Sequence, residues 1–119
     1  MLFFDTYAIF EIINSNPEYQ RFSGETIITS VLNIGELYYG LLKQGNRAKA
    51  DAWVERLQAD LIEIDPETMK RAMTFKYVNR KKKLSMVDCV GYVLAHKLGV
   101  RFLTGDKEFK DLAGVEFVK

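Results

Sequence analysis

Residues 26–43, TIITSVLNIGELYYGLLK, decide the fold. The opening Thr26–Thr29 is rich in β-branched residues, which predicts a short strand. Ser30 is a favourable N-cap for a helix that is expected to run to about Lys43. A strand that leads directly into a helix is the repeating unit of an α/β fold.

The rest of the chain repeats this alternation on both sides. Further strands are predicted at Leu2–Asp5, Leu61–Ile64, Arg101–Thr104 and Val115–Val118. Further helices are predicted at Thr6–Ile13, Glu18–Phe22, Arg47–Ala59, Asp65 towards Lys82, Ser85–Leu98 and Glu108–Leu112. Strands that alternate with helices predict a parallel sheet covered on both faces. Sites on such sheets lie at the carboxyl ends of the strands.

Length and composition indicate one cytoplasmic domain spanning residues 1–119. The chain is 48% hydrophobic, which is ordinary for a globular protein that buries a single core. No apolar run is long enough for a membrane span, and Asp5 interrupts the first apolar stretch, which argues against a signal peptide. The single cysteine, Cys89, excludes an intramolecular disulfide and fits a reduced compartment.

The net charge of +1, from 17 basic and 16 acidic residues, argues against polyanion binding by a globally basic surface. A local contact with phosphates remains open at the run Arg80-Lys81-Lys82-Lys83. The alternative for this run is a solvated helix end, where cations complement the helix dipole.

Four carboxylates stand where the surrounding pattern is apolar or neutral. Asp5 ends the run Leu2-Phe3-Phe4, and Asp106 follows the predicted strand at Arg101–Thr104. Glu36 is the only charged residue between Thr26 and Leu42, and Asp88 is the only one between Leu84 and Ala95. Because ionised groups are rarely buried unless they are paired or metal-bound, the four acids predict a divalent cation site.

Each acid also has a structural explanation. Asp5 could stabilise the start of the first helix, and Asp106 could belong to a turn. Ser85-Met86-Val87-Asp88 has the spacing of a capping box. Glu36 could face solvent, although a surface helix would carry more than one charge.

These residues resemble the PIN-domain family and, in size and spacing, the VapC-type toxin ribonucleases. The matching segments are Phe4-Asp5-Thr6, Thr29-Ser30 followed by Glu36–Gly40, Leu84–Cys89, and Leu103–Phe109. The resemblance implies a three-layer α/β/α sandwich around a parallel sheet of four to five strands.

The resemblance also implies functional residues. Asp5, Glu36, Asp88 and Asp106 would be the catalytic acids and bind Mg²⁺ or Mn²⁺. Two hydroxyl residues, Thr6 and Thr104, would support them. The activity implied is hydrolysis of single-stranded RNA by a homodimeric toxin that an antitoxin protein blocks. Gly105 departs from the pattern, because a polar residue is common at this position.

Two other functions remain open at this point. The chain could be a PIN domain without activity that serves as an RNA-binding or assembly module. A phosphoacceptor signalling domain also places an Asp after its first strand, but that interpretation leaves Glu36 unexplained.

Overall fold

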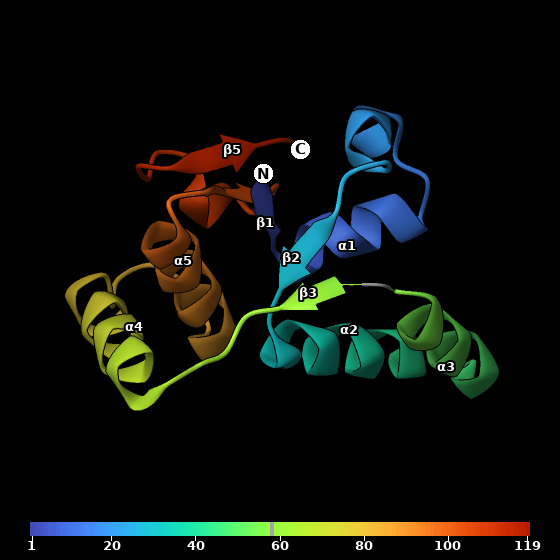
Figure 1. The fold of residues 1–119 in the computed structure, drawn as a ribbon, viewed down its shortest axis with the longest axis horizontal. Helices are drawn as coiled ribbons and strands as arrows, with labels where there is room; N and C mark the ends of the chain where they lie inside the picture. Colours follow the sequence, from blue (N-terminus) through green and yellow to red (C-terminus); the bar gives the residue numbers. More distant parts are fainter. Residues whose placement is uncertain (58) are drawn as a thin grey trace.

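The computed structural model describes residues 1–57 and 59–119, and its five strands form one parallel sheet. The strands are β1 (Leu2–Phe4), β2 (Ile27–Thr29), β3 (Ala59–Leu61), β4 (Arg101–Thr104) and β5 (Val115–Phe117). Their order in the sheet is β3-β2-β1-β4-β5; Figure 1 labels β3, β2, β1 and β5. The predicted α/β fold with a parallel sheet is therefore confirmed.

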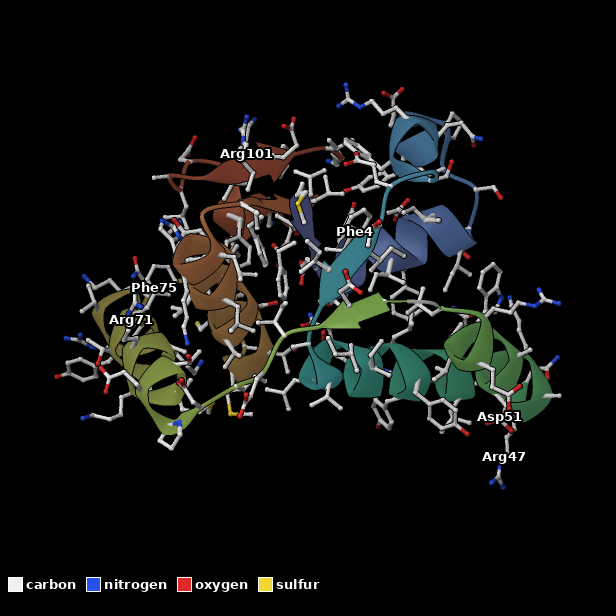
Figure 2. The ribbon with its side chains drawn as sticks, viewed as in Figure 1. Phe4, Arg47, Asp51, Arg71, Phe75 and Arg101 are labelled. Atoms are coloured by element: carbon white, nitrogen blue, oxygen red, sulfur yellow. The ribbon has the colours of Figure 1, made fainter. Side chains whose placement is uncertain are left out.

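Helices cover both faces of this sheet (Figure 1). They are α1 (Thr6–Ile13), α2 (Val31–Lys43), α3 (Arg47–Arg56), α4 (Pro66–Val78) and α5 (Met86–Leu98), with 3₁₀ turns η1 (Pro17–Phe22) and η2 (Lys107–Phe109). Phe3 and Phe102 pack with α4 and α5 in one core cluster. Phe4 and Leu103 point to the other face and pack with α1, α2 and α3 (Figure 2). This alternation produces the predicted three layers. Within the described parts of the chain, no helix is long and apolar enough to cross a membrane.

The order of the strands creates a switch point between β1 and β4. The chain adds β2 and β3 on one side of β1, and then β4 and β5 on the other side. Phe4 pairs with Leu103, and the Asp5 backbone N–H donates to the Leu103 carbonyl at 3.0 Å. Crevices at the carboxyl ends of such neighbouring strands are the usual ligand sites of open α/β sheets.

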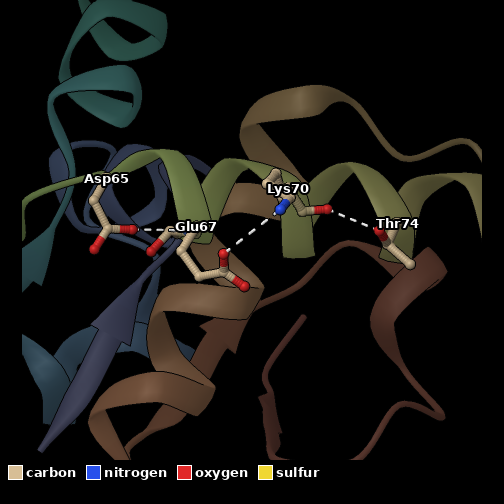
Figure 3. Close-up of polar contacts among 5 residues, drawn as sticks. Asp65, Glu67, Lys70 and Thr74 are labelled. Carbon is tan, nitrogen blue, oxygen red and sulfur yellow. Dashed lines mark hydrogen bonds and ion pairs between the residues drawn. The ribbon is translucent and has the colours of Figure 1, made fainter.

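The helix starts follow their predicted caps. Ser30 accepts a hydrogen bond from the Asn33 N–H at 3.4 Å, and Asp65 accepts one from the Thr68 N–H at 2.8 Å at the start of α4 (Figure 3). Gly99 ends α5 with a left-handed φ of 70°, which a glycine adopts without a steric cost.

The predicted strand at Leu61–Ile64 is wrong in position, because β3 covers Ala59–Leu61. Its partner β2 ends at Thr29, and α2 begins two residues later. Beyond Leu61, only the Ile62 N–H still reaches β2, donating to the Thr29 carbonyl at 2.9 Å. The edge position of β3 explains why its sequence carries no strong strand signal.

Three predicted helices are too long or shifted. The helix expected to reach Ala59 ends at Arg56; Gln58 lies outside the described residues, and Ala59 already belongs to β3. The helix expected to approach Lys82 ends at Val78, where the Asn79 side-chain amide donates to the Phe75 carbonyl at 2.9 Å. The short helix predicted at Glu108–Leu112 is the 3₁₀ turn η2, which begins one residue earlier.

Candidate metal centre

All four predicted acids line one cavity of about 290 Å³, which is here called the acid cavity. Asp5 follows β1, Asp106 follows β4, Asp88 lies in the first turn of α5, and Glu36 lies in the middle of α2. The remaining lining residues are Thr6, Tyr7, Phe10, Tyr39, Gly40 and Lys43. The sheet places two acids here through its switch point, and packing of α2 and α5 adds the other two.

Asp5 is the most enclosed of the four acids, with 3% of its surface exposed. One carboxylate oxygen accepts from the Thr6 N–H at 2.9 Å and so caps α1. The other oxygen accepts from the Thr104 hydroxyl at 2.7 Å. Both supporting hydroxyl residues predicted from the sequence therefore lie beside Asp5, although Thr6 contacts it through its backbone.

Burial raises the pKa of Asp5 from an ordinary value of 3.8 to about 7. The hydrogen bond from Thr104 opposes this effect, whereas the negative charges of Asp88 and Glu36 add to it. Burial is therefore the main reason that Asp5 resists ionisation, and repulsion from the neighbouring acids is a smaller one.

Asp88 forms the predicted capping box at the start of α5. Its carboxylate accepts from the Ser85 N–H at 2.8 Å, and the Ser85 hydroxyl accepts from the Asp88 N–H at 3.1 Å. Burial raises the pKa of Asp88, the hydrogen bonds from Ser85 lower it, and the charges of Glu36 and Asp106 raise it further. Capping therefore holds Asp88 in place while it still faces the other acids.

Asp106 is held by two short-range hydrogen bonds. Its N–H donates to the Thr104 hydroxyl oxygen at 3.1 Å, and its side chain accepts from the Glu108 N–H at 2.9 Å. Thr104 thus connects Asp5 and Asp106, because its hydroxyl donates to one residue and accepts from the other. The carboxylate of Glu108 accepts from the Lys83 N–H at 2.6 Å.

Glu36 is the only one of the four acids that caps nothing. It is half-buried on the face of α2 that also presents Tyr39, Gly40 and Lys43 to the cavity. These residues lie three, four and seven positions after Glu36, which places them on one side of a helix. The predicted solvent-facing alternative for Glu36 does not describe this position.

Two glycines explain how neighbouring elements pack around the acid cavity. A Cβ on Gly40 would overlap the ring of Phe10, so the glycine allows α1 to approach α2 closely. A Cβ on Gly105 would overlap the ring of Tyr7 and the Val118 carbonyl. The glycine that departs from the family pattern therefore occupies a position with no room for a side chain.

Sequence reasoning missed two polar residues at this site. Asn33 is fully buried; its amide donates to the Thr6 hydroxyl oxygen at 3.0 Å and its carbonyl oxygen accepts from the Ser30 hydroxyl at 2.7 Å. A lone amide among the apolar residues of the helix was the available signal. Lys43 was noted only as a helix end, although it is the one cation among the described residues that line the cavity.

The donor set fits a hydrated hard cation. Carboxylate oxygens are the protein ligands that Mg²⁺ and Mn²⁺ prefer, and Mg²⁺ usually keeps several waters beside one or two carboxylates. Within residues 1–57 and 59–119, no three His, Cys, Asp or Glu side chains are already close enough to hold an ion together. Direct binding by one or two acids, with the others contacting its waters, matches this spacing. The charges of Asp88 and Glu36 disfavour ionisation of Asp5, and a bound cation would offset this repulsion.

Comparison with known proteins identifies the fold. The family model of the PIN domain matches residues 2–115. The structure is similar to VapC20, a sarcin-ricin-loop-cleaving toxin from Mycobacterium tuberculosis, with a TM-score of 0.82, 20% identity and full coverage of both chains. It is also similar to a chain of the DNA-bound VapBC from Salmonella typhimurium, with a TM-score of 0.76 and 21% identity over 98% of this chain and 96% of that one.

A toxin–antitoxin complex from Klebsiella pneumoniae gives a TM-score of 0.74 at 17% identity, over 98% of this chain and 96% of that one. At these identities the likeness concerns the fold. No curated protein matches the sequence significantly.

Proposed function

Because this chain belongs to the PIN-domain family, we propose that it is a metal-dependent endoribonuclease that hydrolyses single-stranded RNA in the cytoplasm. The observation that supports this proposal most is the meeting of Asp5, Glu36, Asp88 and Asp106 around one cavity. Without a cation, repulsion within such a cluster of acids lowers the stability of the fold. With a bound cation, the same cluster can promote phosphodiester hydrolysis.

In this proposal Asp5, Glu36 and Asp88 hold the principal Mg²⁺ or Mn²⁺, one or two of them directly and the rest through its waters, and Asp106 serves the same ion or a second one. A bound divalent cation acidifies a water molecule and stabilises negative charge on the phosphate oxygens. Thr104 orients Asp5 by donating to one carboxylate oxygen, and it fixes the backbone of Asp106. Lys43 is positioned to neutralise a phosphate at the edge of the cavity.

We further propose that the chain is a homodimeric toxin with an antitoxin partner. The chain has the size and fold of chains from VapBC and toxin–antitoxin complexes, over nearly their whole length. The proposal extends to partners because an acid cavity open to solvent needs a means of inhibition if it cuts cellular RNA. A small gene immediately upstream whose product copurifies with this chain would support it.

The decisive experiment is a cleavage assay on single-stranded RNA with Mg²⁺, with Mn²⁺ and with EDTA. We expect cleavage that EDTA abolishes and that Asp5→Asn removes. Wild-type rates in the Asp5→Asn variant would show that the assignment of the site is wrong. RNA binding without cleavage under any metal condition would indicate the inactive binding module instead.

A further inference from the structure

A run of four cations, Arg80-Lys81-Lys82-Lys83, connects α4 to α5 and is here called the basic loop. Three of its members, Arg80, Lys81 and Lys83, are exposed. Because α4 ends at Val78, the lysines of the loop lie beyond the last helical turn, where the helix dipole has little effect. Complementing the helix end accounts for Arg80, which donates to the Tyr77 carbonyl, but it does not account for the three lysines that follow.

The basic loop is fastened to the acid cavity through Glu108. The Lys83 N–H donates to the Glu108 carboxylate at 2.6 Å, and the Lys82 ammonium donates to the Glu108 carbonyl at 3.2 Å. The Glu108 N–H in turn donates to Asp106 at 2.9 Å. After Lys83 the chain continues through Leu84 into Ser85, which caps α5 beside Asp88. The Lys82–Lys83 end of the loop therefore lies next to residues that position Asp106 and Asp88.

The charges of the basic loop are not neutralised within the described chain. The ion pairs found there involve Lys70, Lys97 and Arg101, and none involves the loop. Figure 3 shows the contrast on α4, where Lys70 lies 3.9 Å from Glu67. Since the net charge of the whole chain is only +1, this positive charge is local.

Arg80 is also pre-positioned. Its guanidinium donates to the Tyr77 carbonyl at 2.9 Å and lies over the Tyr77 ring at 4.5 Å from the centroid. A guanidinium that is held in this way loses less conformational entropy when it binds a phosphate. Stacking on the ring leaves its other donors available.

We propose that Arg80, Lys81 and Lys83 bind phosphates of single-stranded RNA next to the bond that the acid cavity cuts. This proposal rests on the proposed nuclease function and names the surface that holds its substrate. A cavity of four acids repels a polyanion, so cations beside it are needed to bring the strand near. The phosphate backbone, rather than the bases, is the group that such a run of cations recognises.

Binding of a fluorescein-labelled single-stranded RNA of twelve uridines, measured by fluorescence anisotropy in EDTA over a range of salt concentrations, tests the proposal. Each phosphate contact contributes roughly 0.7 to the slope of log K against log salt for single strands. The triple variant Arg80→Gln, Lys81→Gln, Lys83→Gln should therefore lower the slope by about 2.

The matched control removes three cations outside the basic loop. Lys49 and Arg56 lie on α3, at the end of the molecule opposite α4 (Figure 1), and Lys70 lies on the first half of α4. Lys49→Gln, Arg56→Gln, Lys70→Gln has the same net charge as the loop variant and should keep the wild-type slope. A charge-preserving variant, Arg80→Lys, Lys81→Arg, Lys83→Arg, should also keep it, which separates loss of charge from damage to the loop.

Three results would overturn the proposal: an unchanged slope in the loop variant, an equal fall in the control, or no binding by the wild-type chain. Cleavage with Mn²⁺ separates this proposal from the nuclease proposal. If the loop variant cleaves RNA with wild-type KM, the proposed role of the basic loop is wrong and the nuclease proposal is retained. If the loop variant loses salt-dependent binding and neither the variant nor the wild type cleaves RNA, the proposed RNA contact is retained and the nuclease proposal is wrong.

Discussion

Asp5→Asn should stabilise the metal-free protein at the same time as it removes activity. Asp5 is almost fully buried between Thr6 and Thr104, and its pKa is raised to about 7 from an ordinary 3.8. An asparagine has nearly the same shape and can still accept from the Thr6 N–H. It carries no charge, so it removes the cost of ionising a carboxylate among other carboxylates.

The expected size follows from proton linkage. Between pH 3.8 and about 7 the unfolded chain has lost the Asp5 proton, whereas the folded chain still holds it. The free energy of unfolding therefore falls as pH rises through this window, and it becomes level above it. At about 1.4 kcal/mol for each pKa unit, the full cost is at most about 4 kcal/mol. About 2.5 kcal/mol of it should develop between pH 5 and pH 8.

Urea unfolding in EDTA, followed by the fluorescence of Trp53, measures this effect at the two pH values. The difference between Asp5→Asn and the wild type should grow in favour of the variant from pH 5 to pH 8. Asp111→Asn is the control, because Asp111 is an exposed carboxylate outside the acid cavity. Equal pH dependence in the wild type and in Asp5→Asn would refute the reasoning that the buried cluster carries unfavourable charge.

Three further variants probe the same site. Asp88→Asn keeps an acceptor for its helix cap but should reduce the rise in melting temperature that Mn²⁺ causes, and an unchanged rise would argue against Asp88 as a ligand. Thr104→Val removes a hydrogen bond that lowers the pKa of Asp5. The acidic limb of the pH profile for Mn²⁺-dependent cleavage should therefore move to higher pH, and the free energy of unfolding should fall by about 1–3 kcal/mol. The Cβ of Gly40→Ala would overlap the ring of Phe10, so the variant should lower the free energy of unfolding by about 1–3 kcal/mol, measured by urea unfolding. The double variant Gly40→Ala, Phe10→Leu should recover this stability. If it does not, the strain does not come from Phe10.

The sequence predicted best what local patterns determine. The structure has Asp5 directly after β1 and Asp106 two residues after β4, and it has the predicted caps at Ser30, Asp65 and Ser85. Each of these features depends on residues that are close together in the chain. Because the strands are parallel, their carboxyl ends meet at one edge of the sheet, whatever the sequence between them. This is why acids separated by a hundred residues could be expected to meet.

The sequence predicted poorly what tertiary pairing determines. The position of β3 depends on where β2 ends, and Leu61–Ile64 looked more strand-like than the segment that pairs. A glycine inside a helix does not by itself show which element comes close: among the described residues a Cβ on Gly35 would meet nothing within 4 Å, whereas a Cβ on Gly40 would overlap the ring of Phe10. Neither the strand-like composition of Leu61–Ile64 nor the presence of a glycine in a helix tells which residues lie close together in the folded chain.

The caps at Asp5, Asp88 and Asp106 show that structural and functional explanations of an acid need not compete. A helix N-terminus carries a partial positive charge, and a capping carboxylate there is stabilised by backbone N–H groups. Three of the four acids are held in this way, so each has donors that offset part of the repulsion in the acid cavity. Within the part of the chain that the structure describes, Glu36 has no such donor, and the packing of α2 sets its position. In a cluster built like this, caps fix the positions of acids whose charge would otherwise drive them apart, and a cation can then bind without rebuilding the fold.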